Sequence, residues 1–292
     1  MFLDHYINYL LFEKRFSSHT VEAYQFEVRQ FEEFLNKVNE SVKSVDYHQL
    51  RTYFSTLLEQ GRHPNSVNRS LSALKTYYHF LMREGVVHND PIVGVKALRK
   101  PRKLPTTVSA NSLSVMLDAE GVFGADFAGI RDRLVMELLF GTGIRLSELL
   151  SIRMEDVDLY KEQILIHGKR NKQRLVPLTS SLTKLLREYV ALRESLPEGQ
   201  SNVLVLTDRG KDAYAKLIYR IVQKYLALVS TQSQRSPHVL RHTFATAMLE
   251  NGADLNAIKE LLGHASLSAT QVYTHNSAER LKKIYQQAHP RA

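Results

Sequence analysis

Apolar positions in the first hundred residues recur in steps of three and four, which is the spacing of an amphipathic helix. Four segments show this pattern: Phe2 to Leu11; Val21, Tyr24, Val28, Phe31 and Leu35; Leu50, Tyr53, Phe54, Leu57 and Leu58; and Val67, Leu71, Leu74, Tyr78 and Leu81. Ser17, Ser18 and Thr20 are candidate caps for the second segment, and Gly85 is a stop signal after the fourth. No strand pattern interrupts them, so we predict a small four-helix domain over residues 1–95.

The second part of the chain, residues 108–292, combines helices with one island of strand. Two β-rich runs, Gln163–His167 and Arg174–Leu178, predict a hairpin whose connection from Gly168 to Gln173 is basic. Gly141 is expected to end one helix, and a new helix is expected to begin near Arg145. Further helices are predicted around Leu182–Leu192, Tyr214–Leu226, His238–Leu249, Leu255–Leu262 and Arg280–Gln287. The fold class is therefore mainly α, with a helical N-terminal domain and a mixed α/β, mostly helical second domain that contains a small antiparallel sheet.

Residues 96–107 break the helical pattern between the two domains. This segment has two prolines, no acidic residue and five cations: Lys96, Arg99, Lys100, Arg102 and Lys103. Such a segment cannot bury itself and is typical of a linker. Because nothing acidic nearby neutralises it, we favour contact of this linker with a phosphate backbone over the alternative of a solvated tether.

The net charge of the chain indicates that this mainly helical protein has a polyanionic partner. The 292 residues include 39 Lys and Arg against 30 Asp and Glu, which gives a formal charge of +9. A second basic cluster lies on the predicted hairpin and comprises Lys169, Arg170, Lys172 and Arg174. Charge gathered in clusters of this kind favours a nucleic acid as the partner.

Several classes of protein are excluded by what the chain lacks. Without a cysteine it has no disulfide framework, thiolate metal site or cysteine nucleophile. The N-terminus has no basic region, and Asp4 and Glu13 interrupt its apolar residues, so no signal peptide is predicted. No apolar run approaches the roughly 20 residues of a transmembrane helix. We therefore expect a cytoplasmic protein with no membrane insertion.

The first candidate for chemistry is the segment from Pro237 to His242. On a helix His238 and Arg241 lie one turn apart and share a face. An imidazole can accept a proton near neutral pH, and a guanidinium can hold an anion through two hydrogen bonds. An ordinary surface pair is one alternative, and zinc binding by His238 and His242 is another, because their spacing is that of a zinc-binding helix. That zinc motif, however, requires a glutamate where Val239 stands.

Two further segments place polar groups beside glycine turns. Arg145 follows one such turn at the expected start of a helix, where a cation and free backbone N–H groups can meet a phosphate. An ordinary ion pair between Arg145 and Glu148 is the alternative there. In the other segment Gly263 ends a helix, His264 lies in the turn, and Tyr273 follows. Taken alone, a tyrosine is more often a core or rim residue than a nucleophile.

Taken together, these motifs resemble the active-site series of the tyrosine recombinases, or phage integrase family. The series, in the family's order and spacing, is Arg145, Lys169 in a β-hairpin, His238-x-x-Arg241, Gly263-His264 and Tyr273. The matching text includes 141–149, the hairpin 167–178, nearly all of 236–275 and, in the N-terminal part, 17–24. The C-terminal residues 288–292 resemble those of the Xer type, so the resemblance covers almost the whole chain.

The resemblance implies a transesterification on DNA that needs no metal and no other cofactor. Tyr273 would attack the scissile phosphate to form a 3′-phosphotyrosine, with His238 as its base. Arg145 and Arg241 would hold the non-bridging oxygens, and His264 would donate a further hydrogen bond to them. Such cations can supply the charge that Mg²⁺ supplies in many phosphoryl-transfer sites.

The predicted hairpin would complete this chemistry. Lys169 would protonate the departing 5′-oxygen, and Lys172 in the same loop is the rival candidate. A loop that only clamps phosphate is the simpler alternative. The remaining basic residues of the hairpin and the linker would contact DNA, and Glu148 would orient a catalytic cation.

The resemblance also implies an assembly. The helical domain would be a SAM-like DNA-binding domain, and four protomers, identical or from a recombinase pair, would synapse two duplex sites and exchange strands through a Holliday junction. The C-terminal helix near Ala278 to Gln287 would dock on a neighbouring protomer. Xer-type enzymes resolve chromosome dimers at cell division together with a septal DNA translocase. The alternatives are a mobile-element integrase, a type IB topoisomerase and, from a different class, a non-catalytic DNA-binding module.

Overall fold

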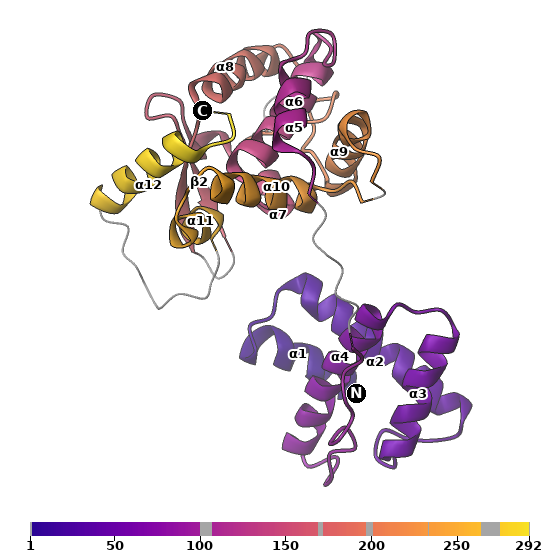
Figure 1. The fold of residues 1–292 in the computed structure, drawn as a ribbon. Helices are drawn as coiled ribbons and strands as arrows, with labels where there is room; N and C mark the ends of the chain where they lie inside the picture. The colour runs from indigo at the N-terminus through magenta and orange to yellow at the C-terminus, as the bar shows by residue number, and fades with distance from the viewer. Residues whose placement is uncertain are drawn as a thin grey trace. The chain divides into compact units, whose positions relative to one another are not determined.

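The chain divides into two compact units, Met1–Lys103 and Leu104–Ala292 (Figure 1). This computed structural model describes residues 2–99, 107–168, 172–196, 201–232, 234–263 and 275–291, and the side chains of 275–278 are not among them. Within the residues so described, no helix is both long enough and apolar enough to span a bilayer.

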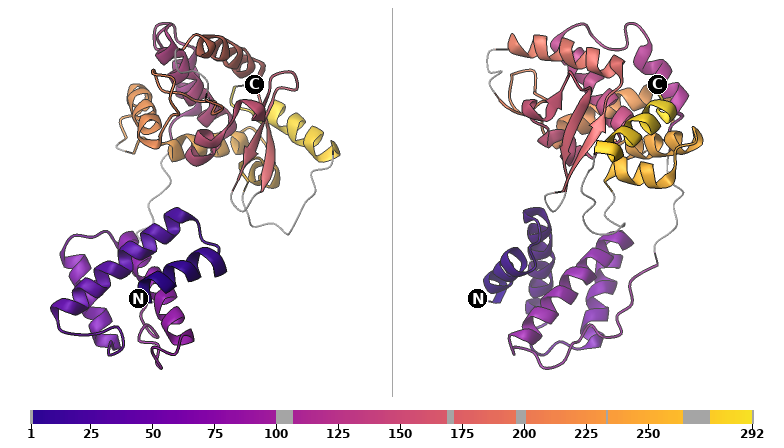
Figure 2. Two further views of the ribbon diagram at one scale, coloured as in Figure 1. Left: turned by 180° about the vertical axis from the view of Figure 1, so that it is seen from behind. Right: turned by 90° about the vertical axis from the view of Figure 1, so that its left-hand side faces the viewer.

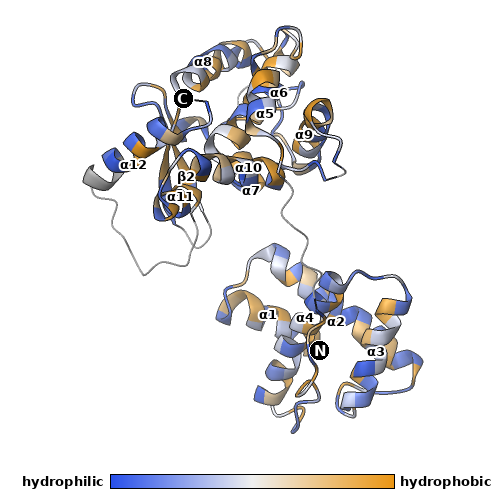
Figure 3. Cartoon of the chain, in the orientation of Figure 1, coloured by the Kyte–Doolittle hydropathy of each residue, from blue (hydrophilic) through white to orange (hydrophobic). Residues whose placement is uncertain are grey.

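Over its described residues, 2–99, the N-terminal unit contains helices and their connections but no strand, as the sequence predicts. Its elements are α1 (Phe2–Asn8), continued by the π-helical turn η1 (Tyr9–Glu13), then α2 (Ser18–Lys37), α3 (Tyr47–Glu59) and α4 (Pro64–Arg83). Of the three candidate caps, Ser17 caps α2, since its hydroxyl accepts from the backbone N–H of Thr20. Apolar stripes and polar faces alternate around these helices (Figure 3). The stripes enclose an aromatic-rich core in which the rings of Tyr6 and Tyr77 meet edge to face with centroids 5.0 Å apart.

The ends of the predicted linker belong to the two units rather than to a free tether. Asn68 on α4 pairs with the backbone of Leu98 through two hydrogen bonds, 2.8 Å to its N–H and 3.0 Å to its carbonyl. This amide pairing fixes the backbone two residues beyond the expected start of the linker at residue 96. On the other side, the N–H of Val108 donates to Oγ1 of Thr243 at 3.2 Å.

The C-terminal unit surrounds a three-stranded antiparallel sheet with helices. Its elements are α5 (Ala110–Asp118), α6 (Phe127–Thr142), α7 (Leu146–Ser151), η2 (Met154–Asp156), β1 (Val157–Asp158), β2 (Gln163–His167), β3 (Gln173–Pro177), α8 (Ser180–Glu194), α9 (Ala215–Val229), α10 (Pro237–Glu250), α11 (Leu255–Leu262) and α12 (His275–Ala288). The strand order is β1-β2-β3. Helix α6 is buried on nearly all sides and packs on α8, α9 and α10, while α11 and α12 lie beside β3 (Figure 2).

Two local predictions in this unit need correction, and one strand has no counterpart among the predictions. The residue that ends α6 is Gly143, which has φ +61°, whereas Gly141 lies inside the helix. Only glycine adopts this left-handed conformation without strain, so the backbone turn and not the first glycine decides the boundary. Strand β3 runs one residue earlier than predicted, and β1 is a two-residue strand that is too short to show a pattern in the sequence.

The C-terminal helix packs within its own unit. Leu281, Tyr285 and Ala288 of α12 are buried in one cluster with residues of α10 and α11. In the isolated chain the apolar face of α12 is covered by its own unit, and docking of this helix on a neighbouring protomer stays a prediction. The residues that follow continue the packing, since Nε2 of His289 lies 2.7 Å from the carbonyl oxygen of Gly141.

Candidate active site

Three arginines from three elements gather around one buried carboxylate, that of Glu148 on α7. Arg145 is the residue just before α7, Arg174 comes from β3 and Arg241 from α10. We call these four residues the arginine cluster. The C-terminal end of α11 contributes further acceptors, because its last carbonyls point into the same place.

Arg145 and Glu148 are joined by their positions at the start of α7. Oε2 of Glu148 accepts from the backbone N–H of Arg145 at 2.8 Å, and Oε1 accepts from Nη1 of the same residue at 2.7 Å. A glutamate three residues into a helix commonly reaches back in this way. The same guanidinium lies 3.4 Å from the carbonyl oxygens of Leu262 and Gly263. Since the Arg145 side chain is 34% exposed, it remains accessible to a ligand.

Arg241 is a buried member of the cluster and faces the turn between α6 and α7. Its guanidinium donates to the carbonyl of Gly143 at 2.6 Å and to that of Leu262 at 2.8 Å. Burial, together with the charge of nearby Arg145, lowers the pKa of Arg241 to about 10. The group is still protonated at neutral pH, in surroundings that disfavour its charge. An anion bound beside it would offset that cost.

Arg174 has a different place from the one its sequence predicts. The basic hairpin predicts a DNA contact, but the Arg174 side chain is only 5% exposed. It donates to both oxygens of Glu148, at 3.0 Å and 2.8 Å, and through Nε to the carbonyl of Leu261 at 2.7 Å. Because these hydrogen bonds occupy the buried guanidinium, Arg174 holds Glu148 and the end of α11 in place and does not present its charge to a DNA backbone.

The strand pattern contained a signal for this placement. Side chains on a strand alternate between two faces, so Arg174 shares a face with buried Val176. Across the ladder Arg174 is opposite Ile166, which is also buried. An arginine at an inward position requires a buried acidic partner. The expected role of Glu148, orienting a cation, agrees with its contacts to both Arg145 and Arg174.

The charge of the cluster is unbalanced toward the positive. Burial alone would raise the pKa of Glu148, but hydrogen bonds and charge from Arg174, joined by hydrogen bonds from Arg145, lower it to about 2. The carboxylate is therefore ionised at neutral pH, and it neutralises one of three guanidinium charges. The surplus, together with one accessible guanidinium, suits an anion such as a phosphate.

Of the other predicted site residues, the structure describes four, and the rest lie outside the described ranges. His238 lies exposed in the first turn of α10, one turn before Arg241, and Lys172 lies exposed where the hairpin returns to β3. Lys96 and Arg99 are exposed at the end of the N-terminal unit. Outside the described residues lie the remaining predicted site residues: Lys100, Arg102, Lys103, Lys169, Arg170, His264 and Tyr273.

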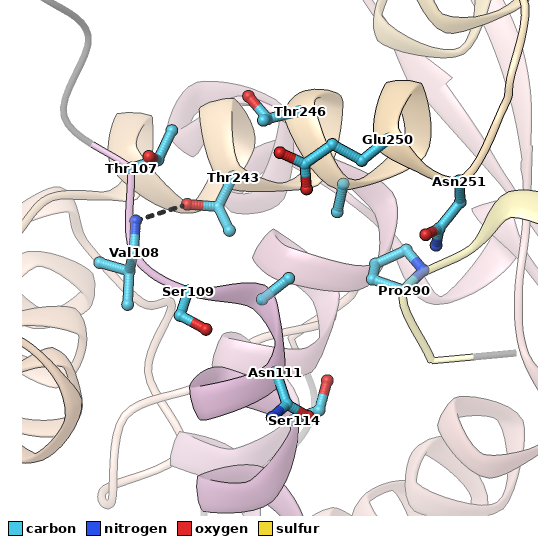
Figure 4. Close-up of a pocket in the computed structure, with 12 residues that line it drawn as sticks. Thr107, Val108, Ser109, Asn111, Ser114, Thr243, Thr246, Glu250, Asn251 and Pro290 are labelled. Atoms are coloured by element: carbon cyan, nitrogen blue, oxygen red, sulfur yellow. Dashed lines mark hydrogen bonds between the residues drawn. The ribbon is translucent and has the colours of Figure 1, made fainter.

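A cavity of about 470 Å³ lies on the other side of α10 (Figure 4). Thr243, Thr246 and Glu250 line it, opposite the start of α5 and Pro290. Helical residues advance by about 100° each, so these side chains leave the helix on the face away from Arg241. The cavity is thus separate from the arginine cluster.

The alternative in which His238 and His242 bind zinc would require further ligands close to them. In the parts of the chain that the structure covers, no group of three or more His, Asp or Glu side chains is arranged to hold a metal ion. A metal-independent reaction remains a prediction from the resemblance, to be tested with a chelator.

Comparison with family models gives a match to both units. The phage integrase family matches residues 111–280, and the N-terminal SAM-like domain of phage integrases matches residues 3–85. The expectation of a SAM-like N-terminal domain is therefore confirmed.

Similar proteins match over nearly the full chain. Tyrosine recombinase XerC of Alcanivorax borkumensis is 33% identical over 288 residues, covering 98% of this chain and 93% of that protein. Tyrosine recombinase XerD of Staphylococcus saprophyticus is 34% identical over 293 residues, covering 99% of each. Among solved structures, the post-cleavage complex of the XerH recombinase with a palindromic difH substrate has 25% identity and a TM-score of 0.73, and the match covers 90% of this chain and 78% of that one.

Proposed function

Because this chain belongs to the phage integrase family of tyrosine recombinases, enzymes that break and rejoin DNA, we propose that it recombines two copies of a specific duplex site through a 3′-phosphotyrosine and a Holliday junction. The observation that carries this proposal is the arginine cluster, in which Arg145 and Arg241 are held beside each other with surplus positive charge. Two fixed guanidiniums are suited to the non-bridging oxygens of one phosphate.

In the proposed cleavage step, the phenol oxygen of Tyr273 forms a bond to phosphorus while the bond from phosphorus to the 5′-oxygen breaks. His238 takes the phenol proton, and Lys169 gives a proton to the departing 5′-oxygen. Arg145, Arg241 and His264 stabilise the charge that develops on the non-bridging oxygens. Rejoining is the reverse reaction with the 5′-hydroxyl of a partner strand, so no energy source is consumed.

Lys172 is the alternative to Lys169 as the acid. Its backbone carbonyl accepts from the N–H of Gly168 at 2.7 Å, so Lys172 directly precedes β3 at the base of the hairpin loop. We retain Lys169 because it directly follows the glycine at the end of β2, as in the family pattern. The exposed cations Lys96, Arg99 and Lys172, together with Lys100, Arg102, Lys103 and Arg170, would bind the DNA backbone.

The biological role that we propose is the resolution of chromosome dimers at cell division. The support is the similarity to proteins named XerC and XerD at closely comparable identity over nearly the whole chain. The active assembly would be a tetramer on two DNA sites, made of one protein or of a recombinase pair, with a septal DNA translocase as a further partner. It would act in the cytoplasm, where bacterial chromosomes are recombined.

Covalent trapping on a pool of DNA sequences tests the chemistry and selects the site in one experiment. The protein is incubated in EDTA with randomised duplexes that carry a nick, so that the short cleaved fragment diffuses away and the adduct persists. We expect a denaturant-resistant complex in which the protein is joined to the new 3′ end of the cleaved strand, and this DNA is then sequenced to identify the site. Tyr273→Phe should abolish this adduct, and Tyr160→Phe, at a tyrosine 92% exposed, is the matched control.

Several results would contradict the proposal. If a Tyr273→Phe variant still forms the adduct, Tyr273 is not the nucleophile. If EDTA prevents cleavage, the reaction is not metal-free and the zinc alternative is favoured. DNA binding without any adduct supports the non-catalytic module. Relaxation of plasmids without exchange between paired selected sites supports a topoisomerase, and exchange only between two unlike sites supports a mobile-element integrase.

A further inference from the structure

A hydrogen-bonded chain of three side chains lies at the loop end of the β2–β3 hairpin, outside the arginine cluster. Nε2 of His167 lies 2.8 Å from Oδ1 of Asp156, and Nδ1 of His167 lies 3.3 Å from the side-chain nitrogen of Gln173. His167 belongs to β2, Asp156 to η2 and Gln173 to β3. None of them has a part in the chemistry described above.

The two partners approach the ring from different sides. A carboxylate can only accept, so Nε2 of His167 donates to Asp156, while the Gln173 amide, as oriented in the structure, turns its nitrogen toward Nδ1. The other oxygen of Asp156 accepts from the backbone N–H of Arg153 at 2.8 Å, and the Asp156 side chain is 6% exposed. The chain therefore begins at a fixed, buried carboxylate and imposes one orientation on the His167 ring.

This chain holds the point where the hairpin loop leaves the sheet. His167 and Gln173 are directly opposite each other in the register, and the N–H of Gly168 donates to the carbonyl of Lys172 as the next rung. Lys169 follows His167 by two residues in the sequence. A constraint on the last pair of a ladder restricts the direction in which the connection departs.

The hairpin is tied down on both of its faces. On the inner face Arg174 binds Glu148 of the arginine cluster, and on the outer face His167 binds Asp156. Residues 173 and 174 are neighbours, so their side chains point to opposite sides of the strand. The inner contact joins the hairpin to the arginines that would hold the phosphate, and the outer contact joins it to η2.

We propose that His167, fixed by Asp156, is a positioning residue for protonation of the leaving group. It holds the hairpin so that the Lys169 ammonium can give its proton to the 5′-oxygen as the bond from phosphorus to that oxygen breaks and the tyrosine–phosphorus bond forms. The inference rests on the proposed function, because it requires a leaving 5′-oxygen. It extends that function by giving His167 and Asp156 a role in positioning the acid.

A substrate with sulfur at the bridging 5′ position separates positioning of the acid from general damage. A thiol is far more acidic than an alcohol, so a thiolate leaves without being protonated. The probes are the duplex selected by covalent trapping and the same duplex with this single sulfur. His167→Ala should slow adduct formation on the oxygen substrate about 10- to 100-fold, which is part of the 10²–10⁴ that a positioned acid contributes. On the sulfur substrate it should react at nearly the wild-type rate.

Four further variants complete the experiment. His167→Gln can still donate to Asp156 and accept from Gln173, so we expect it to restore most of the rate on the oxygen substrate. Lys169→Ala should show the same rescue by sulfur, and combining it with His167→Ala should slow the reaction no further. Gln163→Ala, at the other end of β2, is the control and should react like the wild type on both substrates.

Three results would overturn the proposal. Equal slowing on oxygen and sulfur would mean that His167→Ala damages the whole site. Multiplied effects in the double variant would mean that His167 acts apart from Lys169. A His167→Gln variant as slow as His167→Ala would mean that the hydrogen-bonded chain is irrelevant. If the wild type itself forms no adduct on either substrate, the proposed function fails first, and the inference fails with it.

Discussion

Arg174 and Glu148 form a buried ion pair with two parallel hydrogen bonds, of which the shorter joins Nη2 to Oε2 at 2.8 Å. The pair links β3 to α7, two elements that are separated by the rest of the sheet in the chain. Because Glu148 also accepts from Arg145, the support of the hairpin and the orientation of the exposed arginine depend on one carboxylate. A single substitution at Glu148 should therefore affect both stability and cleavage.

Glu148→Gln should destabilise the C-terminal unit by about 3–5 kcal/mol, the usual cost of removing one partner of a buried ion pair. The amide keeps the shape but leaves Arg145, Arg174 and Arg241 without a compensating charge. Urea unfolding at pH 7 measures the effect. Glu155→Gln is the matched control, since that side chain is 65% exposed, and it should change stability by no more than about 0.5 kcal/mol. Equal stability of the two variants would show that the cluster tolerates three unbalanced guanidiniums.

His289 should make the C-terminal unit sensitive to mild acid. Its ring is buried against Gly141, and this burial lowers its pKa from 6.5 to about 4. The unfolded chain therefore takes up a proton at a higher pH than the folded chain does. The contribution of neutral His289 to the free energy of unfolding is fully present above about pH 6.5 and is lost as the pH falls toward about 4. The total loss of stability from this residue is about 3 kcal/mol.

Unfolding free energies measured at several pH values between 7 and 4 test this prediction about His289. The His289→Gln variant keeps an N–H donor for the Gly141 carbonyl but does not titrate, so its stability should fall less on acidification than that of the wild type. His88→Gln, at an exposed histidine of the N-terminal unit, is the control. Parallel pH profiles for the wild type and His289→Gln would refute the assignment.

Gly143→Ala should damage the site more than its size suggests. The residue has φ +61°, and an added Cβ would lie 2.8 Å from Cδ2 of Leu262 and against the ring of Phe244. Gly252 also has a positive φ but has no atom within 4 Å of such a Cβ, so Gly252→Ala isolates the backbone strain. We expect Gly143→Ala to cost about 1–3 kcal/mol more than this control, as overpacking usually does. Since the Gly143 carbonyl holds Arg241, adduct formation should fall as well.

Lys96 and Arg99 should contribute to DNA affinity through phosphate contacts. Neutralising either by substitution with glutamine should weaken binding to all duplexes alike and reduce the slope of log affinity against log salt by about 1 per charge. Arg99→Lys keeps the charge and should retain the wild-type slope. Unchanged affinity and slope after both neutralisations would favour the solvated tether.

Much of the fold follows from patterns local in the sequence. Apolar residues spaced by three and four predict the helices α2 and α4, and two short β-rich runs predict the β2–β3 hairpin. The local rules fail where a tertiary contact decides the outcome. Gly143 and not Gly141 ends α6, and Leu98 is held on α4 by the side chain of Asn68.

For the candidate site, the sequence by itself determined the reactive groups, their order and their family, because spacing along the chain is enough to match a motif. Only the tertiary structure decided which arginine supports the site from within the protein and which one is accessible to a ligand. Arg174 and Glu148 are 26 residues apart, and Arg241 and the carbonyl of Gly143 are 98 apart. No local periodicity relates residues at such separations. Their contacts arise when α7, β3 and α10 pack on the main core of the C-terminal unit and α11 packs against β3 and α10. Burial in that packing makes Arg174 a support of the site instead of the expected DNA contact.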